Sequence, residues 1–140
     1  MKFQAATGHA IRILGCLGRH NGRIATATDM AQELGITYLY FMKISARLKQ
    51  SGLVVSEQGC NGGYRLARPI DEITIYDAVY AVEGDFCIDK GMIQNEMKED
   101  TRILHRFFIT MQDEMIAQMK ATTIAQLYKK KKEHARISVM

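Results

Sequence analysis

The residues with the clearest chemical potential lie between positions 38 and 50. Phe41, Ile44 and Leu48 recur at the spacing of one helix face, which predicts a helix that packs this face on a core. Its other faces mix two bases with apolar groups that can touch thymine methyls in a DNA groove. These residues are Leu39, Met42, Lys43, Ala46 and Arg47. The alternative is an amphipathic helix whose bases are only solvated, and the helix by itself supports both interpretations equally.

The next stretch offers contacts through its backbone. Leu53 to Glu57 alternates and Tyr64 to Leu66 can pair back with it, which predicts a β-hairpin. Three glycines and an asparagine leave the tip with few large side chains, so its backbone can approach a phosphate closely. The tip consists of Gln58, Gly59, Cys60, Asn61, Gly62 and Gly63, with Arg65 and Arg68 at its base. The alternative is an ordinary surface hairpin with no binding role. This alternative does not explain why the hairpin follows the helix directly.

Three cysteines are present, and their number and spacing restrict their chemistry. Cys16, Cys60 and Cys87 are odd in number and far apart, which argues against a disulfide framework and for a reducing, cytoplasmic setting. They form no CxxC pair, so we expect no metal site. Cys16 fits the interior of a helix as a small hydrophobic residue. Cys60 and Cys87 are candidate redox-sensitive thiols, because an accessible thiolate is reactive.

Short helices and tight turns are expected to position these groups. Apolar spacing predicts a first helix over 3–18 that ends at residues 20–22, where the sequence is His-Asn-Gly. Thr26 and Asp29 resemble a capping box for a second helix, with Thr28 as an alternative cap. Gly35 then supplies a turn and Thr37 caps the helix over 38–50. This spacing is typical of a DNA-reading helix-turn-helix. A further helix is expected over 75–82, after a loop at 70–74.

The last third predicts one long helix over 100–132, followed by a basic end. Its apolar stripe is too wide for the helix to bury alone, so we expect a dimer interface. The stripe residues chosen for this role are Ile103, Phe107, Met111, Met115 and Met119, with Leu127 further along. A ligand groove lined by methionines is a less favoured alternative.

Composition sets broad limits on the class of protein. With 140 residues and 47% hydrophobic content the chain can bury a real core, and its net charge of +4 is compatible with a polyanion partner. No secretory leader or apolar stretch long enough to span a bilayer is apparent. No Ser/His/Asp, Cys/His or paired-carboxylate arrangement stands out, so we do not expect an enzyme.

Several of these motifs together resemble the Rrf2 family of bacterial transcription regulators. They include Ser51-Gly52-Leu53-Val54, Gly62-Gly63-Tyr64-Arg65-Leu66-Ala67, Ile73-Thr74-Ile75 and Ala81-Val82-Glu83-Gly84. The resemblance implies a mainly α winged helix-turn-helix over 1–84, a connecting loop over 85–99, and a dimerisation helix with a basic tail over 100–140. It also implies a homodimer on a pseudo-palindromic operator in double-stranded DNA, with the helix over 38–50 in the major groove and the hairpin in the minor groove.

We select the expected DNA-binding residues from the layout that the resemblance implies and from the residue pattern of the helix and the hairpin. They are Thr28, Thr37, Tyr38, Leu39, Met42, Lys43, Arg47, Gln58, Gly59, Cys60, Asn61, Gly62, Gly63 and Arg65. Met42, Gln58 and Cys60 depart from residues that relatives often carry, which indicates a different operator. Relatives often hold an iron–sulfur cluster through three cysteines in the connecting loop. This chain has only Cys87 there, so we disfavour a cluster.

We therefore expect a sequence-specific regulator, acting as a repressor. Two alternatives stay open at this stage. One is a dimeric protein-interaction module that has lost operator specificity, as the substitutions Met42 and Gln58 suggest. The other is a regulator that senses redox state through Cys60 or Cys87.

Overall fold

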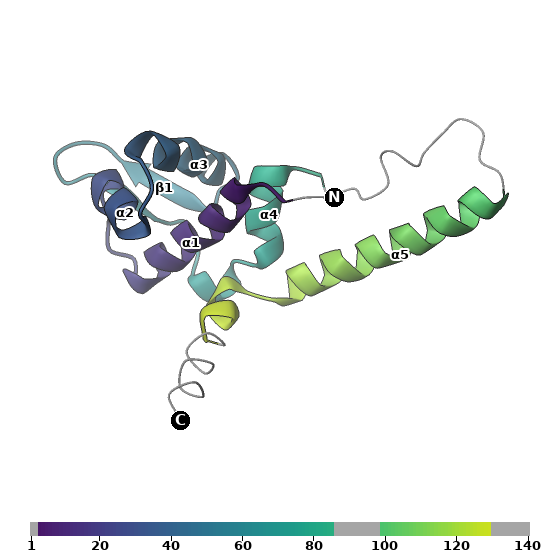
Figure 1. Cartoon of the computed structure of the whole chain (residues 1–140). Coiled ribbons are helices and arrows are strands. Elements are labelled where there is room, and N and C mark those ends of the chain that lie inside the picture. The colour runs from purple at the N-terminus through teal and green to yellow at the C-terminus, as the bar shows by residue number, and fades with distance from the viewer. Residues whose placement is uncertain (1–2, 86–98, 130–140) are drawn as a thin grey trace, which may run out of the picture.

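The computed structural model describes residues 3–85 and 99–129, and it forms a small helical body from which one long helix projects (Figure 1). The helices of the body are α1 (Ala5–Arg19), α2 (Ala27–Leu34), α3 (Tyr38–Gln50) and α4 (Ile75–Glu83). A hairpin of β1 (Val54–Glu57) and β2 (Gly63–Leu66) follows α3, and a short 3-10 helix spans Ile70–Glu72. The projecting helix is α5 (Glu99–Ala121). The mainly helical fold with a hairpin wing is confirmed.

The core lies between α1, α2, α3 and α4. The helix faces that the sequence pattern selected are buried there, and they include Ile13, Leu14, Met30, Phe41, Ile44 and Leu48. Apolar burial of this kind supplies most of the stability of short helices, which are marginal when isolated. The body is therefore a single packed unit that holds α3 in a fixed orientation.

Side-chain caps and glycines define the helix-turn-helix as expected. The Thr26 hydroxyl accepts a hydrogen bond from the Asp29 amide at 3.1 Å, so Thr26 rather than Thr28 is the cap of α2. Gly35 ends α2 with a φ of 70°, a left-handed conformation that favours glycine. The Thr37 hydroxyl then accepts from the Tyr40 amide at 3.1 Å and caps α3.

The start of α1 is held by the end of α4. One carboxylate, that of Glu83, accepts hydrogen bonds from the Gln4 amide and from the Thr7 hydroxyl, each at 2.6 Å. These donors, the Thr7 hydroxyl foremost, lower the pKa of Glu83. Glu83 therefore caps α1 from outside the helix, since the preceding Gln4 side chain provides no cap.

The expectation of one continuous helix over 100–132 was wrong. α5 ends at Ala121, and a second short helical segment occupies 124–129. Between them the chain pairs with the start of α4, where the Ile75 amide donates to the Thr122 carbonyl and the Ile124 amide donates to the Ile73 carbonyl, both at 2.9 Å.

A local sequence signal accounts for this break. The Thr123 hydroxyl accepts from the Gln126 amide at 3.1 Å, and the Gln126 side chain accepts from the Thr123 amide at 2.9 Å. This reciprocal pair is a capping box, which starts a new helix. The loop expected over 70–74 also differs, because residues 70–72 form a 3-10 turn.

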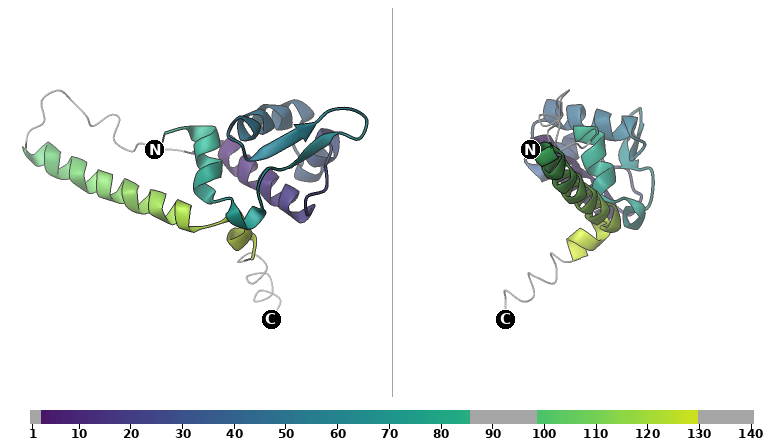
Figure 2. Two further views of the ribbon diagram at one scale, coloured as in Figure 1. Left: turned by 180° about the vertical axis from the view of Figure 1, so that it is seen from behind. Right: turned by 90° about the vertical axis from the view of Figure 1, so that its right-hand side faces the viewer.

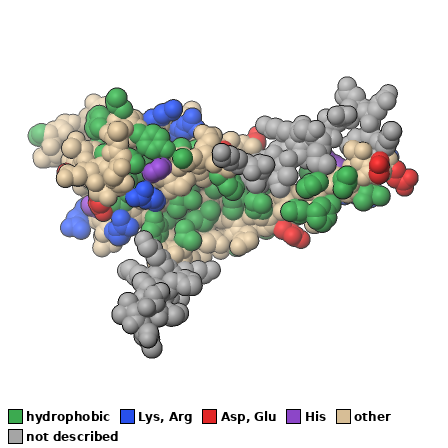
Figure 3. All heavy atoms as spheres, in the orientation of Figure 1, with side chains coloured by type: hydrophobic (Ala, Val, Ile, Leu, Met, Phe, Trp, Pro, Cys, Tyr) green, Lys and Arg blue, Asp and Glu red, His purple; other side chains and the backbone are tan. Residues whose placement is uncertain are grey.

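α5 leaves much of its apolar side uncovered, and Figure 2 shows the helix extending away from the body. Ile103 is 63% exposed and Phe107 59% exposed, whereas Met119, near the body, is buried. In the space-filling view the hydrophobic side chains continue along α5 towards the body (Figure 3). The parts of the chain that the structure describes contain no helix with the length and apolar character needed to cross a membrane. Of the loop expected over 85–99, residues 86–98 with Cys87 lie outside the described residues, as does the tail beyond 129, and Glu99 belongs to α5.

Candidate DNA-binding face

The first turn of α3 is the most accessible part of the helix-turn-helix. Tyr38 is 51% exposed and Leu39 is 79% exposed, while the opposite side of α3 is buried in the core. Lys43 lies one turn further along and is also exposed. Within the described part of the chain Lys43 makes no ion pair, so its charge is available to a phosphate. An exposed helix turn of this composition is suited to contacts in a major groove.

Two residues expected on that surface are turned elsewhere. Arg47 is half-buried, and its guanidinium Nη1 donates to the Val82 carbonyl oxygen at 2.8 Å, which ties α3 to α4. Met42 is half-buried, and its Sδ accepts a hydrogen bond from the Tyr64 hydroxyl at 3.4 Å. Neither residue is among the exposed ones of this face, and their expected role in DNA binding stays a prediction. Helix periodicity separates core from surface, but it does not identify the flanks where α4 and the hairpin pack.

Tyr64 anchors the hairpin beside α3, a role that the sequence analysis missed. Its ring meets the ring of Phe41 edge to face, with centroids 5.4 Å apart and planes at 84°. Burial, and to a smaller extent the neighbouring Tyr38, raises the pKa of Tyr64, so its hydroxyl stays a donor to Met42. Its place within β2, directly after two glycines, is the only signal in the sequence for this role.

The glycine pair before Tyr64 is required by close backbone packing. A Cβ at Gly62 would collide with the Glu57 carbonyl oxygen, and a Cβ at Gly63 would collide with the Ala25 carbonyl oxygen. Ala25 and Tyr64 exchange backbone hydrogen bonds of 2.9 and 2.7 Å, so the segment before α2 lies against β2. Gly62 thus permits the tight hairpin tip, and Gly63 allows the hairpin to lie against the body. This is a more specific role than the freedom to approach a phosphate that the sequence suggested.

The hairpin itself has the predicted antiparallel pairing. Its register places Val54 opposite Leu66 and Glu57 opposite Gly63. The tip residues Gln58, Gly59, Cys60 and Asn61 are exposed, as a phosphate or minor-groove contact requires. Their role in DNA binding stays a prediction.

The basic residues near the hairpin are engaged in exposed ion pairs. Arg65 lies 3.4 Å from Glu57, and Arg68 lies 3.0 Å from Asp77. Exposed pairs of this kind contribute roughly 0–1 kcal/mol, so a phosphate can replace the carboxylate at little cost. Thr28, in the first turn of α2, is exposed.

An apolar groove of about 490 Å³ lies where α1, α4 and α5 meet. Its lining includes Phe3, Ile11, Ile75, Met115, Met119 and Leu127. Met115 and Met119 come from the stripe expected to form a dimer interface, and Leu127 reaches the groove from the short helical segment after α5. The groove is continuous with the exposed apolar side of α5, which makes a partner helix a suitable occupant.

Comparison with known proteins places this geometry among transcription regulators. The profile of the Rrf2 family, described as "Iron-dependent Transcriptional regulator", matches residues 3–130. Protein aau3 of Rhizobium meliloti is 33% identical over 97 residues, covering 66% of this chain and 63% of that protein. The putative HTH-type transcriptional regulator YwgB of Bacillus subtilis is 33% identical over 98 residues, covering 68% of this chain and 63% of that protein. The chain thus spans less than two thirds of the length of these curated relatives.

Solved structures share the fold. The structure of CymR (YrzC), described as the global cysteine regulator of B. subtilis, has a TM-score of 0.74 at 24% identity, and the match covers 91% of this chain and 95% of that one. IscR of T. potens has a TM-score of 0.70 at 20% identity, covering 96% of this chain and 90% of that one. Each match covers more residues than the helical body contains. The structural similarity therefore extends beyond the helix-turn-helix.

Proposed function

The chain belongs to the Rrf2 family of transcriptional regulators, and from that premise we propose that it binds a pseudo-palindromic operator as a homodimer and acts as a repressor. The single observation that carries the proposal is the exposed first turn of α3, with Leu39 79% exposed beside Tyr38 and Lys43. A large apolar side chain this exposed, next to a free cation, suits direct readout of thymine methyls with phosphate contacts alongside.

Homodimerisation is supported by the uncovered side of α5. A monomer rarely leaves a contiguous apolar surface exposed, and here it runs from Ile103 to the groove beside α1. A second copy related by a two-fold axis would cover it and would place two α3 helices for two half-sites. A dimer that covers both half-sites occludes promoter DNA, which is the physical basis for repression.

The dimer interface can be tested separately from DNA binding. Phe107→Asp places a charge in the proposed interface, and we expect sedimentation to show a monomer. Ala117→Asp adds the same charge on the polar side of α5, near Arg106 and Asp113, and should leave the dimer intact. A dimer that survives Phe107→Asp, or dissociates equally with both variants, would rule out this interface.

The thiols do not fit an iron–sulfur cluster. Cys16 is fully buried in α1 and Cys60 is exposed at the hairpin tip. The segment that binds clusters in relatives contributes one cysteine here, Cys87, where several thiolates are needed. We therefore propose that the regulator works without a cluster, and no step of its action is assigned to one.

Sequence selection tests the DNA-binding proposal. The full-length protein is incubated with a pool of random duplexes, and bound DNA is amplified and sequenced over several rounds. We expect an inverted repeat to be enriched. Uniformly weak binding that enriches no motif would contradict the proposal and favour a protein-interaction module in its place.

A charge-matched pair of variants then locates the contact. Lys43→Ala should weaken binding and reduce the salt dependence of affinity by about one counterion, because one phosphate contact is lost. Lys49→Ala removes the same charge from a residue whose Nζ already donates to the Ser56 hydroxyl at 2.7 Å. It should have the smaller effect. Equal salt dependence in both variants would show that Lys43 makes no specific phosphate contact.

Exposure of Cys60 at the hairpin tip favours a second candidate, redox control of the same binding. Hydrogen peroxide would oxidise the Cys60 thiolate to a sulfenic acid and be reduced to hydroxide. The changed group would then disturb the hairpin's approach to phosphate. Operator binding should become peroxide-resistant in Cys60→Ser, with Cys87→Ser as the comparison. Unchanged peroxide sensitivity in Cys60→Ser would eliminate this candidate.

A further inference from the structure

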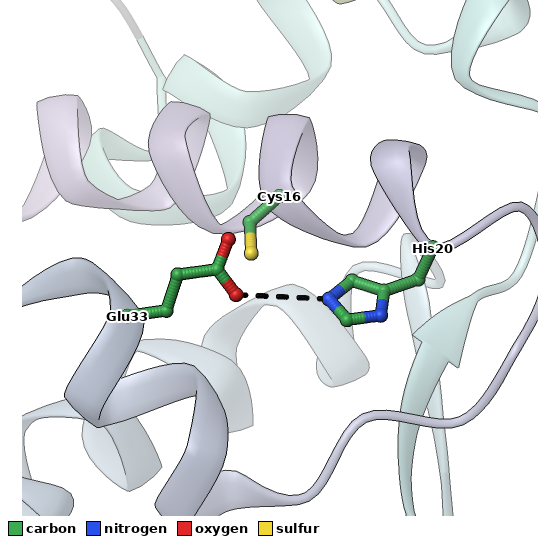
Figure 4. Close-up of side chains that lie close together, drawn as sticks. All are labelled: Cys16, His20 and Glu33. Carbon is green, nitrogen blue, oxygen red and sulfur yellow. Dashed lines mark ion pairs between the residues drawn. The ribbon is translucent and has the colours of Figure 1, made fainter.

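Three potential metal ligands converge where α1 ends beside α2. Cys16 and His20 lie one turn apart at the end of α1, and Glu33 approaches them from α2 (Figure 4). One donor atom from each residue lies within 4.8 Å of the other two. The His20 Nε2 and the Glu33 Oε2 are 3.7 Å apart. None of the three belongs to the DNA-binding face.

The set combines a thiol, an imidazole and a carboxylate, which are the three ligand types of Zn²⁺. Zinc bonds of about 2.0–2.3 Å place neighbouring donors of a tetrahedral site roughly 3.5 Å apart. The observed cluster is slightly wider than this. His20 and Glu33 have side chains that are 31% and 46% exposed, so small rotations can close it, while buried Cys16 stays fixed.

We propose that Cys16, His20 and Glu33 form a mononuclear site for a zinc-class divalent ion, with a water molecule as the fourth ligand. Zinc keeps its charge on binding and displaces the proton of the Cys16 thiol, which is released to solvent. The two anionic ligands then balance the charge of the ion. The partial exposure of His20 and Glu33 supplies a route by which the ion can enter.

The surroundings are compatible with this assignment. Burial, followed by the neighbouring Glu33 carboxylate, raises the pKa of the Cys16 thiol from 9.0 to about 11, so without metal it is protonated. The Sγ of Cys16 donates to the Sδ of Met30 at 3.5 Å, and the thiol beside Glu33 lowers the pKa of that carboxyl, which is therefore an ionised ligand near neutral pH. Arg19 lies 3.4 Å from Oε1 of Glu33, whereas Oε2 faces His20. One carboxylate oxygen can thus bind the ion while the other keeps its cationic partner.

A bound ion would connect the last turn of α1 to α2, the first helix of the helix-turn-helix. Because an ion that binds the folded chain preferentially stabilises it, zinc should raise the melting temperature. The proposed metal site is independent of the proposed function, because the test of the metal site requires no DNA.

The test uses Co²⁺ as a spectroscopic substitute for zinc in the full-length protein, after metal removal and in a non-thiol reductant. We expect one Co²⁺ per chain, with a thiolate charge-transfer band and the intense visible bands of tetrahedral cobalt, all removed by added Zn²⁺. The double variant Cys60→Ser/Cys87→Ser, which retains only the Cys16 thiol, should give the same spectrum.

Ligand variants complete the test. His20→Ala and Glu33→Gln alter partly exposed side chains and should stay folded by circular dichroism. Each should weaken cobalt binding by roughly 100-fold or more, because even indirect partners of a metal ligand contribute 10–100-fold. Cys16→Ser should abolish the charge-transfer band. The proposal is overturned if the parent protein binds no cobalt, if either ligand variant binds normally, or if the Cys60→Ser/Cys87→Ser variant loses the spectrum.

Discussion

The guanidinium of Arg47 donates a hydrogen bond to the carbonyl oxygen of Val82 at 2.8 Å, joining α3 to the last turn of α4. The interaction ties α3 to the body, so we propose that Arg47 has a structural role. A hydrogen bond from a charged donor contributes about 1.5–3 kcal/mol. We expect Arg47→Ala to lower the free energy of unfolding by about 2 kcal/mol in urea denaturation.

Lys43 provides the comparison for Arg47. Lys43→Ala should leave the urea midpoint nearly unchanged, since the side chain is exposed and makes no ion pair within the described residues. If Arg47→Ala instead left stability unchanged and reduced only DNA affinity, the assignment of Arg47 to a structural role would be wrong.

Glu83 makes the start of α1 sensitive to pH. Its folded-state pKa is lowered from 4.5, mainly by the Thr7 hydroxyl, so its contribution is present above that value and is lost as the pH falls through the folded pKa. We expect Glu83→Gln to be less stable than the parent at pH 7, by about 1 kcal/mol. Denaturation measured across the acidic range should show this difference shrinking as the parent carboxylate becomes protonated. A difference that is independent of pH would contradict the role of the charge.

Gly63 and Gly59 both have a positive φ, of 155° and 104°, but only Gly63 also packs closely on a neighbouring segment. Gly63→Ala would push its Cβ into the Ala25 carbonyl oxygen, so the hairpin must move away from the segment before α2. Gly59→Ala meets no atom within 4 Å, although its φ of 104° is unfavourable for alanine. We expect thermal melting to show a clearly larger loss for Gly63→Ala, with the Gly59→Ala cost near the roughly 1 kcal/mol of a left-handed residue. Equal losses would show that the contact with Ala25 matters little.

Gly15 allows the short segment after α5 to dock on α1. A Cβ at this position would overlap the ring of Tyr128, so Gly15→Ala should displace residues 124–129 and increase their amide hydrogen exchange. In a Tyr128→Ala background the same substitution should cost little, because the ring is gone. Additive effects of the two changes would refute the proposed contact.

Local sequence signals predict most of the secondary structure of the helical body. Thr26, Gly35 and Thr37 mark the helix-turn-helix through caps and a left-handed turn, which depend only on near neighbours. The core face of α3 followed from apolar spacing in the same way. The break after α5 could also have been read, from the capping box formed by Thr123 and Gln126.

What the sequence could not provide depends on tertiary contacts. Arg47 and Met42 lie at the edges of the exposed face, and only the packing of α4 and β2 decides where they point. Glu33 is 13 residues from His20 in sequence, and no spacing rule connects it to Cys16 across two helices. Long-range neighbours of this kind become visible only in the fold.

The central claim is that two copies of α3 read two half-sites held at a fixed separation, and half-site spacing tests it directly. In a dimer the half-site centres are separated by about 10–10.5 base pairs or a multiple, so that both face the protein. Equilibrium binding is measured to the selected duplex and to the same duplex with about 5 base pairs inserted between its half-sites, a half turn of the DNA. A duplex with the insertion outside the half-sites is the control. We predict that the internal insertion lowers affinity by roughly 1,000-fold, towards non-specific binding, and that the external insertion has no effect. Equal affinity for all three duplexes would contradict the claim.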